Sequence, residues 1–125
     1  MDSPGARRKV LLAEDDPIVR RLTFTLLTHA GFSVQAVANG QEALEQADGG
    51  GFDLIVSDAT MPVLGGIELL QALRDRGDLT PFVLMSGYTD GRTESSAPLA
   101  SALLAKPFGN TALLAAVEAA LSAGR

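Results

Sequence analysis

Short runs of apolar residues alternate with segments of helical periodicity along the whole 125-residue chain. Five runs have the length and composition of buried strands. They cover residues 10–13, 32–37, 53–58, 82–86 and 102–105. Strands that are apolar almost throughout are typical of a parallel sheet with both faces covered, and the intervening segments supply the covering helices. The pattern therefore predicts one α/β domain built on a parallel sheet.

Apolar residues at helical spacing predict the helices between these strands. The first helix should begin at Pro17, with Asp16 as its N-cap, and should be closed by Gly31. Its predicted inward-facing positions are Val19, Leu22, Leu26 and Ala30. Two further helices are predicted around residues 43–47 and 67–73. The last helix is predicted to face the sheet with Leu114, Val117 and Leu121.

Composition and charge exclude several classes of protein. The net charge of −5 argues against nucleic acid as a direct partner. The absence of cysteine excludes disulfides and thiolate metal sites, and the single histidine, His29, excludes a histidine-rich zinc site. His29 itself is interpreted as a solvated helix-end residue. No apolar run suits a signal peptide or a membrane span, so we expect a cytoplasmic domain over residues 9–123 after a flexible lead at 1–8.

Polar side chains that could carry chemistry follow the predicted strands at the points where these end. They are Glu14 and Asp15 after the first strand, Asp58 at the third, Ser86 at the fourth and Lys106 after the fifth. Ligands of open parallel sheets bind at the carboxyl ends of the strands, and right-handed connections bring those ends to one edge. We therefore expect these five residues to form one site.

Three carboxylates at one edge would repel each other, by roughly 4 kcal/mol for a pair about 4 Å apart at an effective dielectric constant of 20. Such a cluster requires raised pKa values or a bound cation. Oxygen ligands without histidine or cysteine favour Mg²⁺. An anion with several oxygens, such as a phosphoryl group, would fit between that cation and Lys106. Asp58 is then the candidate nucleophile.

Four segments in this order, "LLAEDDP", "LIVSDATMP", "VLMSGYTD" and "LLAKPF", resemble the receiver domain of two-component response regulators over about residues 8–122. The "MSGYTD" and "KPF" segments are especially similar to receivers attached to hybrid sensor histidine kinases. The resemblance implies a doubly wound, flavodoxin-like (βα)5 fold. Its parallel sheet would have the strand order 2-1-3-4-5 and helices on both faces.

The resemblance also implies roles for the acidic residues. Asp58 would be the phosphoacceptor, taking a phosphoryl group from the phosphohistidine of a sensor histidine kinase or a histidine phosphotransfer protein. Asp15 would bind Mg²⁺ directly, with Mn²⁺ as an alternative ion, and Glu14 would bind it through water. Thr60, two residues after the acceptor, would offer its backbone carbonyl to the metal. Such a domain assists its own phosphorylation and dephosphorylation but is not otherwise an enzyme.

At the other strand ends, the resemblance implies that Ser86 and Lys106 hydrogen-bond the phosphoryl group and that the Lys106–Pro107 peptide bond is cis. One position departs from the family pattern, because Leu103 stands where many receivers carry an aromatic residue. Residues 87–100 give only a weak helix signal and contain two glycines and a proline. We therefore expect a short or mobile helix there, and signalling through a relay or through changed order of that region.

Some alternatives stay open at this point. The fold could serve as a pseudo-receiver, a module for protein interaction without phosphorylation, although the complete acidic, serine and lysine set argues against it. The chain could be a stand-alone regulator or the receiver of a larger hybrid kinase. It could also be a monomer or a weak dimer.

Overall fold

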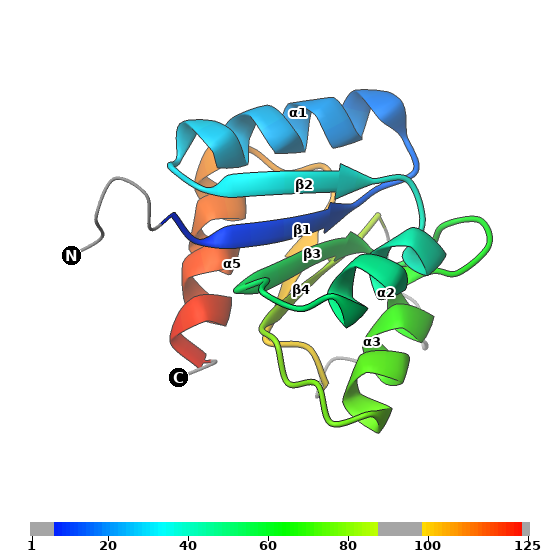
Figure 1. Cartoon of the computed structure of the whole chain (residues 1–125). Coiled ribbons are helices and arrows are strands. Elements are labelled where there is room, and N and C mark those ends of the chain that lie inside the picture. Colours follow the sequence, from blue (N-terminus) through cyan, green and yellow to red (C-terminus); the bar gives the residue numbers. More distant parts are fainter. Residues whose placement is uncertain (1–6, 88–98, 124–125) are drawn as a thin grey trace.

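The computed structural model describes residues 7–87 and 99–123. The described residues form one parallel sheet with the strand order β2-β1-β3-β4-β5 (Figure 1), as the resemblance implied. The strands are β1 (Lys9–Ala13), β2 (Ser33–Val37), β3 (Leu54–Asp58), β4 (Phe82–Ser86) and β5 (Ala102–Ala105). Each agrees with its predicted range to within one residue. Two predicted segments lie largely outside the described residues. They are residues 1–6 of the lead predicted at 1–8, and residues 88–98 of the weak helix predicted at 87–100.

Helices cover both faces of this sheet. They are α1 (Pro17–His29), α2 (Gly40–Asp48), α3 (Gly66–Asp75) and α5 (Asn110–Ala123). Figure 1 shows α1 and α5 on one face, with α2 and α3 on the other. None of the helices in the described part of the chain has the length and apolar character needed to cross a membrane.

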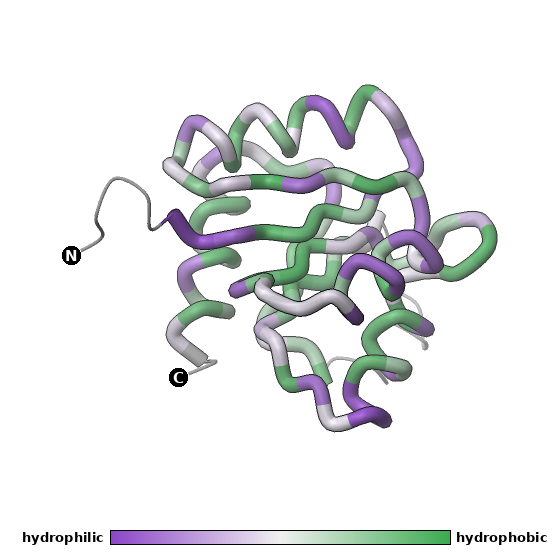
Figure 2. Tube along the Cα trace, viewed as in Figure 1, coloured by the Kyte–Doolittle hydropathy of each residue, from purple (hydrophilic) through white to green (hydrophobic). Residues whose placement is uncertain are grey.

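Each central strand contributes to two apolar layers, which explains why its sequence is apolar almost throughout. In β1, Leu11 and Ala13 pack in the layer beneath α2 and α3, whereas Val10 and Leu12 pack beneath α1 and α5. All four side chains are fully buried. In Figure 2 the strands are accordingly coloured mainly as hydrophobic, while α2 at the surface is mainly hydrophilic.

The ends of α1 follow the predicted signals. The Asp16 carboxylate accepts hydrogen bonds from the N–H groups of Ile18 and Val19, at 2.9 and 3.4 Å, and Pro17 occupies the first helical position. Gly31, just beyond the C-cap, has a φ of 101°, a conformation that a side chain would strain. The helix therefore begins and ends where the sequence predicts.

The inward face of α1 was predicted only in part. Val19 and Leu26 are half-buried, and Leu26 packs against the core. The fully buried residues of the helix are Thr23 and Leu27, whereas Leu22 is 53% exposed and Ala30 is also exposed. A polar Thr23 can occupy the buried face because its hydroxyl donates a hydrogen bond to the Val19 carbonyl at 2.7 Å. The local bond satisfies the polar group, so hydrophobicity alone misplaces the face by about one residue.

The inward face of α5 was predicted only in part. Val117 is buried, but Leu114 and Leu121 are half-buried at the flanks. The buried positions also include Leu113, Ala116 and Ala120. Alanines let the helix backbone approach the sheet closely, so two small residues share the centre of this contact with Leu113 and Val117.

Candidate functional site

The predicted site residues gather at the carboxyl edge of the sheet. Asp58 is the last residue of β3, Ser86 is the last residue of β4, and Glu14 follows β1 directly. Lys106 follows β5, and its backbone N–H donates to the Ser86 carbonyl at 2.8 Å. The parallel register aligns these strand ends, so residues 92 positions apart come into contact.

Glu14, Asp15 and Asp58 form an acidic cluster that could hold a cation. One carboxylate oxygen from each lies within 4.8 Å of the others. The cluster is graded in exposure: Glu14 is fully buried, Asp58 is half-buried, and Asp15 is exposed. An all-oxygen donor set that is partly open to solvent suits a hard ion such as Mg²⁺, which keeps several waters when it binds.

Lys106 links two members of this cluster. Its Nζ lies 2.8 Å from Glu14 Oε1 and 3.3 Å from Asp58 Oδ1. Lys106 therefore forms ion pairs with both carboxylates, and the shorter contact is with Glu14. The strands that carry Glu14 and Lys106 are separated by β3 and β4, a span of roughly 14 Å. Two long side chains are therefore needed to bridge it, and they meet beside Asp58.

The electrostatics of the cluster follow from its burial. Burial raises the pKa of Glu14 above its ordinary value, and this effect outweighs the hydrogen bonds from Lys106 and from the Asp16 N–H. Burial likewise raises the pKa of Asp58 against the opposing charge of Lys106. For Lys106, burial would lower the pKa, but the hydrogen bond to Glu14 and the charge of Asp58 raise it. A bound divalent cation would, like Lys106, stabilise the charged forms of Glu14 and Asp58.

The backbone around Asp58 is held by close packing against the start of α3. An ideal Cβ placed on Gly66 would lie 2.0 Å from the Asp58 carbonyl oxygen and 2.7 Å from Ser57 Oγ. Ser57 Oγ itself donates to that carbonyl at 3.0 Å. Beyond the strand, the Ala59 N–H donates to the Met85 carbonyl at 2.7 Å. Only glycine permits this approach, so α3 and the loop after β3 fix the position of the Asp58 carboxylate.

The remaining predicted residues differ in their surroundings. Ser86 is half-buried beside the strand that leads to Lys106, and Thr60 is exposed two residues beyond Asp58. Leu103, at the position where an aromatic is common, is 49% exposed. The Lys106–Pro107 bond is cis, as predicted.

The sequence interpretation missed Arg20. Its Nη1 donates to the backbone carbonyl of Glu14 at 2.9 Å and lies 3.5 Å from that of Asp15. An arginine six positions after a strand-end acid carries no local signal for such a contact, because the contact depends on how α1 folds back over the turn before it.

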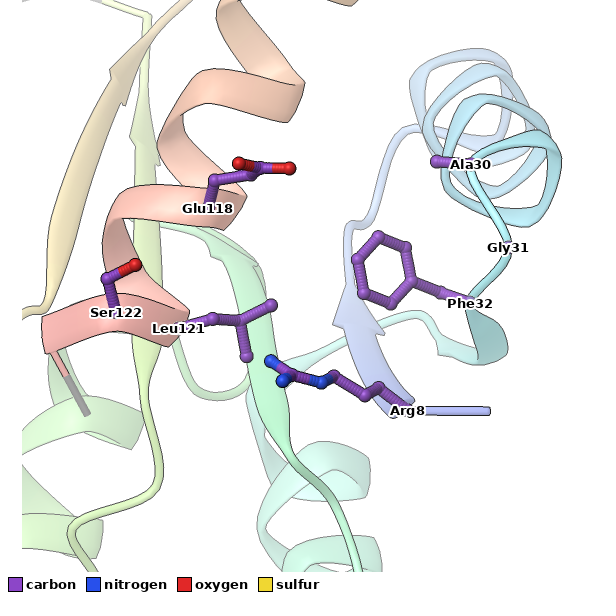
Figure 3. Close-up of a pocket in the computed structure, with 7 residues that line it drawn as sticks. All are labelled: Arg8, Ala30, Gly31, Phe32, Glu118, Leu121 and Ser122. Atoms are coloured by element: carbon purple, nitrogen blue, oxygen red, sulfur yellow. The ribbon is translucent and has the colours of Figure 1, made fainter. Parts of the chain in front are cut away.

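A separate cavity of about 320 Å³ lies at the opposite edge of the sheet, near the amino ends of β1 and β2 (Figure 3). Its lining residues are Arg8, Ala30, Gly31, Phe32, Glu118, Leu121 and Ser122. None of the predicted site residues lines it.

His29, exposed at the end of α1, also stands apart from the acidic cluster, in agreement with its interpretation as a solvated residue.

The family assignment follows from comparison with known proteins. The family model of the response regulator receiver domain matches residues 10–118. The match covers most of the chain, so the protein belongs to the response regulator receiver domains of two-component systems.

Curated relatives carry a similar domain within longer proteins. The Regulator of RpoS of Escherichia coli (strain K12) is 34% identical over 103 residues, which are 82% of this chain and 29% of that protein. Transcriptional regulatory protein TcrA of Mycobacterium tuberculosis is 32% identical over 89% of this chain and 45% of its own length. Sensor kinase CckA of Brucella abortus is 35% identical over 87% of this chain and 12% of its own length. The chain therefore spans less than half of each.

Solved structures share the fold over nearly their whole length. Chemotaxis response regulator CheY4 of Vibrio cholerae superposes with a TM-score of 0.82 at 31% identity, covering 91% of this chain and 98% of that chain. Response regulator TrrA of Thermotoga maritima, in complex with Mg²⁺ and BeF, gives a TM-score of 0.83 at 26% identity, covering 90% and 98%.

Proposed function

We propose that this domain, over residues 9–123, accepts a phosphoryl group on Asp58 in a Mg²⁺-dependent reaction. The donor is the phosphohistidine of a sensor histidine kinase or of a histidine phosphotransfer protein in the cytoplasm. The observation that carries the proposal is the position of the Asp58 carboxylate, within 4.8 Å of two further carboxylates and 3.3 Å from the Lys106 ammonium.

In the proposed reaction, a carboxylate oxygen of Asp58 attacks phosphorus and forms an acyl phosphate. The phosphorus–nitrogen bond of the donor breaks, and the leaving imidazole nitrogen keeps the electron pair and takes a proton. Lys106 remains protonated, because Glu14 and Asp58 raise its pKa, and pairs with a phosphoryl oxygen. Ser86, at the end of β4, donates its hydroxyl to another phosphoryl oxygen.

The acidic residues fit the metal that the family implies. Asp15, Asp58 and the Thr60 carbonyl would hold Mg²⁺, or Mn²⁺ in its place, with Glu14 contributing through water. The bound ion supplies charge neutralisation for the phosphoryl oxygens. The all-oxygen donor set supports this assignment, as does the similar TrrA structure in complex with Mg²⁺ and BeF.

The relatives place similar domains in two settings, transcriptional regulatory proteins and a sensor kinase. A receiver in either setting would pass its state to a second domain or partner. The exposed Leu103 offers no hydroxyl with which to couple to Ser86. We propose that the signal leaves by a relay rather than by aromatic switching. The other route expected from the sequence, through residues 87–100, falls mostly on residues outside those that the structure describes.

The experiment that tests the proposal is intact-mass spectrometry after incubation with Mg²⁺ and acetyl phosphate or phosphoramidate. We expect one added phosphoryl group, which is lost when EDTA is present and in Asp58→Asn. Asp75→Asn, at the exposed end of α3, is the matched control and should be phosphorylated like the wild type. A folded wild-type chain that gains no phosphoryl group would instead support a pseudo-receiver that docks proteins without phosphorylation.

A further inference from the structure

Arg20 connects helix α1 to the turn that carries the acidic pair. Its side chain is half-buried, and its Nη1 donates to the Glu14 carbonyl at 2.9 Å, with the Asp15 carbonyl at 3.5 Å. Its own backbone N–H donates to the Asp16 carbonyl at 2.8 Å. One residue of α1 therefore contacts three consecutive carbonyls of the β1–α1 turn.

The Glu14 carbonyl lies beyond the paired part of the sheet, because the registers of β1 with β2 and β3 both end at Ala13. The other polar groups of Glu14 are already engaged. Its N–H donates to the Val37 carbonyl at 3.1 Å, Oε1 accepts from Lys106 at 2.8 Å, and Oε2 accepts from the Asp16 N–H at 3.2 Å. The guanidinium thus completes the hydrogen bonding of a buried residue at the centre of the acidic cluster.

From this geometry we infer that Arg20 is a positioning residue for the cation site. By holding the turn through its carbonyls, it sets the directions from which the Glu14 and Asp15 carboxylates approach Asp58. The inference rests on the proposed function, because it concerns the Mg²⁺ that this function requires. Arg20 touches neither the metal nor the phosphoryl group in this assignment, and acts only through the turn.

A positioning role for Arg20 and a purely electrostatic one predict opposite changes in Mg²⁺ affinity when Arg20 is replaced, so the inference can be tested. Removing a positive charge near three carboxylates should, by electrostatics alone, strengthen the binding of a divalent cation. Loss of a positioning hydrogen bond should weaken it. Arg21 provides the matched control, because it is adjacent in sequence, carries the same charge and is exposed. Among the described residues, its side chain makes no hydrogen bond or ion pair with the turn.

The experiment compares R20M with R21M in the full chain. Isothermal titration with Mg²⁺ and the electron paramagnetic resonance signal of free Mn²⁺ both measure the dissociation constant. We expect R20M to bind Mg²⁺ about three- to tenfold more weakly, the range given by the loss of one hydrogen bond. R21M should bind as tightly as the wild type or slightly more tightly. R20K, which keeps the positive charge and a single donor nitrogen, should recover part of the loss.

A purely structural role would lower thermal stability without this pattern. We therefore also expect the phosphorylation rate of R20M by acetyl phosphate to return to within about twofold of the wild-type rate when Mg²⁺ is saturating. Equal Mg²⁺ affinity in R20M and R21M, while the wild type binds Mg²⁺ and is phosphorylated, would overturn only the role of Arg20. A wild-type chain that binds no Mg²⁺ would overturn the proposed function as well. If R20M does not fold, the comparison is made with R20K instead. A Mg²⁺ affinity of R20K equal to that of the wild type would then overturn the inference.

Discussion

Replacement of Lys106 by methionine tests how the acidic cluster is stabilised. Methionine keeps the apolar length of the side chain but removes the ammonium that lies 2.8 Å from Glu14 Oε1 and 3.3 Å from Asp58 Oδ1. Glu14 is fully buried, so its carboxylate cannot turn to water in place of the lost partner. One hydrogen bond, from the Asp16 N–H, remains to it.

The magnitude follows from these distances. At an effective dielectric constant of 20, the attractions at 2.8 and 3.3 Å are roughly 6 and 5 kcal/mol. Desolvation of the ammonium offsets part of them, and the removal of one partner from a buried pair costs about 3–5 kcal/mol in practice. The Lys106 side chain is 21% exposed, so the cost should lie at the lower end of this range, at about 3 kcal/mol. We expect K106M to lose about 3 kcal/mol of unfolding free energy.

The loss should depend on pH. Lys106 lowers the pKa values of Glu14 and Asp58 against the effect of burial, so its removal raises them further above their unfolded values. A carboxyl group with a raised folded pKa binds its proton more tightly in the folded state. K106M therefore regains stability as pH falls through the raised folded pKa toward the unfolded value. The difference from the wild type should be largest near pH 8 and smaller near pH 5.

Urea unfolding followed by circular dichroism measures this difference. With a slope of about 1.5 kcal/mol per molar urea, the K106M midpoint should fall by about 2 M. K9M, the same substitution at an exposed lysine, is the matched control and should cost less than about 1 kcal/mol. The double variant E14Q/K106M should regain at least half of the loss. A K106M loss below about 1 kcal/mol, or one that does not change with pH, would refute the reasoning.

Two further predictions concern the loop after β3. Gly66→Ala should lower the unfolding free energy by about 1–3 kcal/mol and slow phosphorylation, because its Cβ would meet the Asp58 carbonyl. Gly109→Ala, where a Cβ meets nothing within 4 Å, is the control and should be neutral. Equal urea midpoints for the two variants would contradict the packing argument. Val63 is 80% exposed with a φ of 70°, so Val63→Asn should raise stability by about 0.5–1 kcal/mol through relief of backbone strain, and a lowered melting temperature would count against strain there.

The placement of Asp58 and Lys106 could be predicted from the sequence because it depends on a rule of topology. Each ends an apolar run, and parallel strands with right-handed connections bring their carboxyl ends to one edge. The register that aligns Asp58 with Met85 and Ser86 with Ala105 is the consequence. The same rule could not predict the distances between side chains at this edge, so it did not show that Lys106 lies closer to Glu14 than to Asp58.

The sequence by itself determined the elements, their order along the chain, and the chemical nature of the site, because apolar runs and strand-end charges are local patterns. Only the tertiary structure decided which faces of α1 and α5 are buried, since a local hydrogen bond at Thr23 and the small size of Ala116 and Ala120 override hydrophobicity. It also decided the contacts of Arg20 with the acidic turn. Such contacts depend on the rotation of each helix and on the reach of side chains across strands, and periodicity along a chain specifies neither.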